Sequence, residues 1–278
     1  MEVLLQQILS GLATGSLYAL AAFGLVLIFK TMDVVNFANG EMAMLSAFIA
    51  YTGINHFGLS YPLAVLAAVI FGGLLGMIVE RLVIHPIEDT SPLTLIIVTL
   101  GLFMIFNGGA GLIWGYSPTS FPEAVKGEPL SIIGAQISPH SVVTILVCLI
   151  IMTGIYLFFK KTMAGIAIRA TAEDITTARL MGINVSRVFL ITWAVSTMLG
   201  ATAGILIAPT TFLSVNMMAD VQIKAFSGAV LGGFTSLPGA VAGSLLLGVL
   251  ENLVAGYIST KLKTTFAFAL IIIVLWIK

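Results

Sequence analysis

The sequence has few charged residues and a single cysteine. Only 9% of its 278 residues are Asp, Glu, Lys or Arg, and 59% are hydrophobic. In soluble domains roughly a quarter of all residues are charged. This composition therefore excludes an ordinary soluble protein and predicts an integral membrane protein. Cys148 has no second cysteine with which to form a disulfide within the chain. Its place in an apolar run predicts a small buried hydrophobic residue.

Several sequence patterns that would indicate other kinds of protein are also missing. No Lys or Arg precedes Lys30, so the basic region of a cleavable signal peptide is missing and the first apolar run is expected to be a retained span. The net charge of zero gives no sign of nucleic-acid binding. No G-x-x-x-x-G-K-[ST] phosphate loop is present, so we expect no ATP hydrolysis by that mechanism. His56, His85 and His140 are scattered over separate segments, which predicts no metal site.

Long apolar runs dominate what is present, and they predict transmembrane helices rather than a barrel. Eight are expected to be spans, near residues 8–29, 35–53, 62–83, 93–114, 142–159, 188–208, 240–258 and 265–277. A ninth, near 223–234, is short and glycine-rich, and either crosses the membrane or re-enters it. We therefore expect an all-α bundle of about eight to nine spans, forming a single transmembrane domain over residues 1–278.

Basic residues predict the orientation, because Lys and Arg in short loops stay on the cytoplasmic side. Five of the twelve lie between Lys160 and Arg187. If this segment is inside, the 81–92 loop is also inside, and the 118–139 loop and the N-terminus are outside. A full crossing by the short ninth run would put Lys261 outside, and a re-entrant run would keep it inside.

The second apolar run begins with polar residues. The sequence MDVVNFANGEMAMLSAF, residues 32–48, places Asn36, Asn39 and Glu41 at the mouth of a predicted span. Ionisable residues at membrane depth cost about 2.5 to 3.5 kcal/mol, so they persist mainly where they face protein, water or a partner. Two interpretations stay open: these side chains line part of a transport pathway, or they cap the helix near the interface.

Three further residues are pathway candidates. Glu251 lies within an apolar run, where it either packs inward or takes part in a pathway. Gly232 and Gly233 belong to a glycine-rich stretch, and the TSLPGA sequence that follows predicts a break between two helical pieces. Glycines four residues apart recur along the chain, a spacing that lets helix backbones approach closely in lipid. These pairs are Gly11 and Gly15, Gly72 and Gly76, Gly111 and Gly115, Gly200 and Gly204, Gly228 and Gly232, and Gly239 and Gly243.

The 160–187 segment contains residues that start and stop a helix, which a loop that only sets the membrane topology does not need. Thr171 is placed to cap a helix, with Glu173 and Asp174 in its first turn and Gly182 as a stop. This predicts a short amphipathic cytoplasmic helix from Ala172 to Leu180. Its apolar positions could fill a groove on a partner; they are Ala172, Ile175, Leu180 and Met181. The alternative is a solvated loop that only sets the topology.

Four stretches carry a family resemblance: NFANGEMAML from residue 36, ERLVIHPI from 80, RATAEDITTARLMGIN from 169 and VLGGFTSLPGAVAGSLLLGVLEN from 230. On these the chain resembles the permease subunits of bacterial high-affinity branched-chain amino acid importers. Asn39 is a departure, since the family more often has His there.

The resemblance implies a permease like those of type II ATP-binding-cassette importers, in the bacterial inner membrane. A second similar permease subunit, identical or different, would complete the pathway. Two cytoplasmic ATPase subunits would hold ATP and Mg²⁺, so no cofactor is expected on this chain, and an extracytoplasmic binding protein would deliver the amino acid. The 160–187 segment would be the coupling loop, with candidate residues Arg169, Ala172, Glu173, Asp174, Ala178 and Gly182.

Other functions stay open at this point. Relatives of this permease type carry urea, short amides or other amino acids. A self-sufficient secondary transporter would fit the helix break near Gly233 and would leave the coupling segment without a purpose. An intramembrane enzyme would need a convergent catalytic pair, for which Glu41 with Glu251 is the only candidate.

Overall fold

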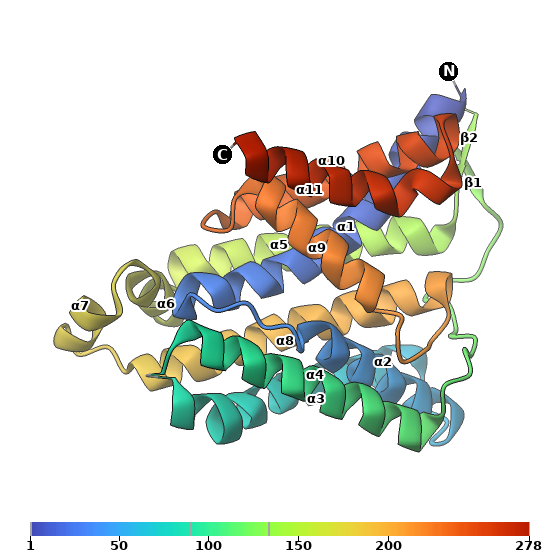
Figure 1. Cartoon of the computed structure of the whole chain (residues 1–278). Helices are drawn as coiled ribbons and strands as arrows, with labels where there is room; N and C mark the ends of the chain where they lie inside the picture. The colour runs from blue at the N-terminus through green and yellow to red at the C-terminus, as the bar shows by residue number, and fades with distance from the viewer. Residues whose placement is uncertain (1, 89, 133, 278) are drawn as a thin grey trace. The chain divides into compact units, whose positions relative to one another are not determined.

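The computed structural model describes residues 2–88, 90–132 and 134–277, and most of them are helical (Figure 1). The first half of the chain contains α1 (Glu2–Met32), α2 (Asn39–Asn55), α3 (Tyr61–Val79), the π-helical turn η1 (Glu80–Ile84), the 3-10 turn η2 (His85–Ile87), α4 (Pro92–Trp114), and the hairpin strands β1 (Leu130–Ile132) and β2 (Ala135–Ile137). The second half contains α5 (Pro139–Lys161), α6 (Met163–Glu173), α7 (Ile175–Leu180), α8 (Val185–Thr211), α9 (Ala219–Gly232), α10 (Leu237–Tyr257), the 3-10 turn η3 (Thr260–Leu262) and α11 (Lys263–Ile277). The predicted all-α class is confirmed.

Among the described residues, six helices are long and apolar enough to cross a membrane: α1, α3 with its two turns, α4, α5, α8 and α10. The prediction of eight to nine spans is therefore wrong in its number. Helices α2 and α9 have 17 and 14 residues. At 1.5 Å per residue they reach about 21 to 26 Å, short of a core about 30 Å thick. The extent of an apolar run does not fix where its helix begins. The second run was expected to span residues 35–53, and α2 starts only at Asn39.

The helices group into two compact units, which are described separately. The α8 unit comprises residues 24–121 and 152–219, and the α10 unit comprises residues 1–23, 122–151 and 220–278. That the two act together as one transmembrane domain stays a prediction.

In the α8 unit, small residues bring α2 and α3 onto α8. A Cβ added at Gly76 would lie 2.8 Å from the Trp193 carbonyl oxygen, and one at Gly204 would lie 2.7 Å from the Ala43 carbonyl oxygen. The predicted close packing at these glycines is confirmed. Gly115 differs, because its φ of 82° ends α4 and its Cβ would meet nothing within 4 Å.

In the α10 unit, α10 runs antiparallel to α1. Gly11 lies against Val249, Gly15 against Leu245, and Gly256 against Gln7. The start of α1 and the end of α10 therefore share one end of this unit. With the N-terminus outside, as the basic residues predict, Lys261 also lies outside.

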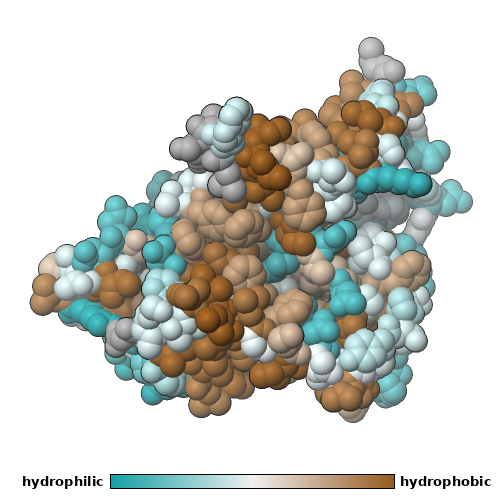
Figure 2. Space-filling model, viewed as in Figure 1, coloured by the Kyte–Doolittle hydropathy of each residue, from teal (hydrophilic) through white to brown (hydrophobic). Residues whose placement is uncertain are grey.

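Several helices expose apolar faces. On α4 the exposed side chains are Leu93, Ile97, Leu100, Met104, Ile105, Leu112 and Ile113. Figure 2 shows hydrophobic side chains gathered over α4. Exposed apolar surface of this extent is what lipid contact requires of a multi-pass membrane protein, and the predicted location in the membrane is confirmed.

Candidate functional site

The coupling segment folds as two helices rather than one. Helix α6 ends at Glu173, and Asp174 adopts an extended conformation before α7 begins at Ile175. The predicted continuous helix from Ala172 to Leu180 is therefore wrong. Thr171 does not cap it, because its hydroxyl donates to the Ala167 carbonyl inside α6. Asp174 is the cap: its carboxylate accepts the Thr177 backbone N–H, and this hydrogen bond lowers the pKa of Asp174.

The predicted stop at Gly182 is confirmed. Gly182 has φ of 82°, its N–H donates to the Arg179 carbonyl, and the Ile183 N–H donates to the Ala178 carbonyl. These two bonds form the Schellman motif, in which glycine provides the left-handed residue. Ala178 itself is buried in a cluster with Val185 and Phe189. It anchors α7 on the start of α8, and so it does not belong to the free surface of the segment.

The exposed surface of this segment is partly apolar. Helix α7 lies at the left of Figure 1. Leu180, its last residue, is 83% exposed, and Met181, which follows it, is 77% exposed; these two residues are called the α7 tip. Ile175 is also exposed, Ala172 is half-buried, and the charged Arg169 and Glu173 side chains are exposed nearby. The tip shows hydrophobic side chains beside hydrophilic ones in Figure 2. An apolar tip with charges at its rim is the arrangement that a partner groove recognises.

A second group surrounds the predicted polar mouth of α2. Asn36, Asn39 and Glu41 are all buried. The Asn36 side chain accepts the Ala38 backbone N–H in the turn before α2. The Ser196 hydroxyl of α8 lies 3.4 Å from Asn39 Oδ1. The Asn107 amide of α4 donates to Glu41 Oε2 at 3.2 Å.

Asn107 was not recognised from the sequence, and it connects three segments. Besides Glu41 it donates to the Val215 carbonyl at 3.0 Å and lies 3.3 Å from Asn216 Oδ1. These contacts join residues 66 to 109 positions apart in the chain. No local pattern could have indicated them.

Replacing Asn107 with Leu is expected to lower the free energy of unfolding by about 1 to 3 kcal/mol, because buried Glu41 and the Val215 carbonyl lose their donor. Unfolding in detergent with increasing SDS would measure the change. Asn55→Leu is the matched control, since among the described residues the exposed Asn55 amide donates only to the Tyr51 carbonyl of its own helix. Equal stability of the two variants would contradict the role given to Asn107.

The third group lies between α9 and α10. Lys224 Nζ is 2.7 Å from Glu251 Oε1, and the two side chains are 8% and 0% exposed. Lys224 also lies over the Tyr18 ring, 5.6 Å from its centroid. The sequence placed Glu251 in an apolar run, and the structure supplies its partner. Lys224 is the only charged residue in the short run near 223–234, so no sequence pattern linked it to Glu251.

The two glycines named as pathway candidates form the corner that joins α9 to α10. A Cβ on Gly232 would lie 1.8 Å from the Gly239 carbonyl oxygen, so the two backbones touch. Gly233 has φ of 93°, which favours glycine. Both positions have a packing reason for glycine, and a pathway role for them stays a prediction.

The candidate pathway residues therefore separate into two sets with their own partners. Glu41 belongs to the α8 unit and is bonded by Asn107, and Glu251 belongs to the α10 unit and is paired with Lys224.

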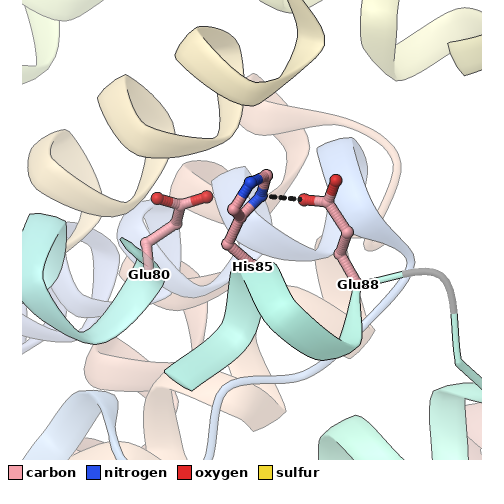
Figure 3. Close-up of side chains that lie close together, drawn as sticks. All are labelled: Glu80, His85 and Glu88. Atoms are coloured by element: carbon pink, nitrogen blue, oxygen red, sulfur yellow. Dashed lines mark hydrogen bonds and ion pairs between the residues drawn. The ribbon is translucent and has the colours of Figure 1, made fainter. Parts of the chain in front are cut away.

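One further cluster joins residues that the sequence did not connect. Glu80, His85 and Glu88 place a carboxylate oxygen or ring nitrogen each within 4.8 Å of one another. Figure 3 shows the Glu80 and Glu88 carboxylates on either side of the His85 ring. Glu88 also lies 3.9 Å from Arg179 of α7.

The chain is similar to known permeases along nearly its whole length. Residues 7–275 match the family model described as the permease component of branched-chain amino acid transport systems. The high-affinity branched-chain amino acid transport system permease protein LivH of Salmonella typhimurium is 32% identical over 98% of this chain and 92% of its own length. BraD of Pseudomonas aeruginosa, with the same description, is 32% identical with the same coverage. No solved structure gives a significant match.

Proposed function

The chain belongs to the family of permease components of branched-chain amino acid transport systems, and on this premise we propose that it is the membrane-spanning subunit of an ATP-binding-cassette importer for leucine, isoleucine and valine. A second permease subunit would complete the pathway, and an extracytoplasmic binding protein would deliver the substrate. Two ATPase subunits would dock on the inner face and supply the energy. The location is the bacterial inner membrane, as the sequence predicted.

The observation that carries this proposal is the exposed tip of α7. Leu180 and Met181 project from a helix whose other face is held on α8 by buried Ala178. A movement of α7 would therefore be passed to α8, a helix of 27 residues that packs against α2 and α3. Closure of the ATPase subunits would pull on this tip and rock the helices between inward and outward openings.

Catalysis by this chain is not part of the proposal. The sequence has no phosphate loop, so ATP would be hydrolysed on the partner subunits. Glu41 and Glu251 each have a partner within their own unit, which gives neither an evident role as an acid or base.

The double variant Leu180→Glu, Met181→Glu is expected to abolish leucine uptake and to lower recovery of the ATPase subunits with the permease at least tenfold. The two apolar side chains would be buried when the ATPase subunit docks, and the variant makes them charged. The fold of the permease itself should be unaffected, because both side chains are exposed in it. Radiolabelled uptake in cells that express the whole importer, with affinity purification of the complex, would measure both.

Met163→Glu is the matched control, since Met163 is 84% exposed on α6 and lies outside the α7 tip. Wild-type uptake by the double variant would sink the proposed coupling surface. Reversal of Asp174 is a less useful test, because that residue also caps α7. Uptake that persists without any ATPase subunit would instead indicate a secondary transporter, and inhibition of leucine uptake by urea or short amides would contradict the proposed substrate.

A further inference from the structure

We infer that Glu80, His85 and Glu88 form a binding site for a divalent transition-metal ion of the Zn²⁺ or Mn²⁺ type, at the end of the helix that begins as α3. The site is independent of the proposed transport function. It lies in the α8 unit, and all three residues fall within nine positions of the chain.

The first observation is the π-helical turn. In a regular α-helix, side chains five residues apart point about 140° away from each other. At η1 the His85 backbone N–H donates to the Glu80 carbonyl, a bond across five residues that widens the turn. Glu80 and His85 are thereby brought to one side of the helix, as Figure 3 shows. Single π-helical turns within α-helices occur frequently at functional sites.

The second observation is the state of Glu80. The residue is 0% exposed, and neither of its carboxylate oxygens accepts a hydrogen bond from any described residue. Its carboxylate points toward the His85 ring (Figure 3). An ionised carboxylate buried without a partner is strongly unfavourable, and a bound cation would compensate it.

The third observation is the geometry of the donors. His85 Nδ1 lies 3.0 Å from Glu88 Oε2, and all three donor atoms lie within 4.8 Å of one another. Around a tetrahedral ion with bonds of about 2.0 to 2.2 Å, ligand atoms are about 3.4 Å apart. His85 Nδ1 and Glu88 Oε2 are hydrogen-bonded at nearly this spacing, so a metal ion would displace the proton between them to solvent. Rotation of the Glu80 side chain would add its carboxylate.

The donor set indicates which ions fit. One imidazole and two carboxylates suit Zn²⁺ or Mn²⁺, and the two carboxylates neutralise the charge of the ion. His85 is 32% exposed, so water can complete the coordination. The other oxygen of Glu88 faces Arg179 at 3.9 Å, which would orient this carboxylate from outside the site. The sequence prediction of no metal site considered His85 only together with the other two histidines, and therefore did not include the two nearby glutamates.

The test uses the full-length chain in detergent, stripped of metal with a chelator and dialysed against Zn²⁺. We expect one Zn²⁺ per chain, with affinity lowered at least about tenfold in both Glu80→Gln and His85→Asn. Co²⁺ bound to the wild type should give visible absorption bands that His85→Asn removes. His56→Asn and Glu123→Gln, which change exposed residues elsewhere, are the matched controls and should bind as the wild type does.

Equal Zn²⁺ binding by the wild type and His85→Asn would overturn the proposal, as would the loss of binding in His56→Asn alone. Absence of Zn²⁺ and Mn²⁺ binding to the wild type would also overturn it, and would leave Glu80 as a protonated buried acid. If Glu80→Gln does not fold, as judged by size-exclusion chromatography, the partly exposed His85 carries the test. Because no ATPase subunit is present, failure here leaves the proposed transport function untouched.

Discussion

Replacing Lys224 with Met is expected to lower the free energy of unfolding by about 3 to 5 kcal/mol, because Glu251 is left as a buried charge without its partner. Lys224 lies on α9 and Glu251 on α10, and both side chains are buried. Unfolding in mixed micelles with increasing SDS would measure the loss. Lys261→Met, which removes an exposed lysine from the same unit, should change stability by less than about 0.5 kcal/mol.

The double variant Lys224→Met, Glu251→Leu separates packing from transport. Removing both charges with apolar residues of similar size often restores or exceeds the original stability. If the pair only holds α9 against α10, the double variant should recover both stability and leucine uptake. Recovery of stability without uptake would indicate that the charges serve the pathway. Equal stability of Lys224→Met and Lys261→Met would show that the ion pair does not stabilise the unit.

The second large effect is expected at the α9–α10 corner. Gly232→Ala would place a Cβ 1.8 Å from the Gly239 carbonyl oxygen and 2.2 Å from its carbon, both in the backbone. Because no side chain can rotate away, α9 and α10 must separate. We expect a loss of about 3 kcal/mol in the free energy of unfolding, at the upper end of overpacking effects, together with loss of leucine uptake.

Two further glycine substitutions provide the comparison for this result. At Gly233 an added Cβ meets nothing within 4 Å, but the φ of 93° costs an L-residue about 1 to 2 kcal/mol, so Gly233→Ala should be milder. Gly101, inside α4, has neither constraint, and Gly101→Ala should gain up to about 1 kcal/mol of helix stability. Wild-type stability of Gly232→Ala would contradict the close contact. The same SDS titration, applied to all three variants, provides the comparison.

Local features of the fold were readable from the sequence. The stop at Gly182 was predicted because a Schellman motif needs a left-handed residue directly after the helix. The glycine spacing on α1, α3 and α8 predicted close helix contacts, because backbone approach in lipid depends on small side chains. The prediction failed where two local signals competed. Thr171 and Asp174 are both residue types that cap helices. Asp174 caps α7, so the helix that was expected from Ala172 to Leu180 is divided between α6 and α7.

The candidate pathway residues show the limit of such reasoning. Asn36, Asn39, Glu41 and Glu251 were selected because a polar residue in an apolar run needs a partner. The partners themselves, Asn107 and Lys224, lie 66 and 27 residues away along the chain and carry no mark of their own in the sequence. Their roles follow from which helices pack together.

By itself, the sequence determined the class of the molecule, its family resemblance and the cytoplasmic segment suited to a partner, because composition and motifs are local properties of the chain. Only the tertiary structure decided the number of helices long enough to cross the membrane, the division of the coupling segment at Asp174, and the ion pair of Lys224 with Glu251. It also decided the grouping of Glu80 with His85, which depends on a widened helical turn. The physical reason is common to these cases: they depend on where helices end and which faces meet, and both are set by packing between distant segments.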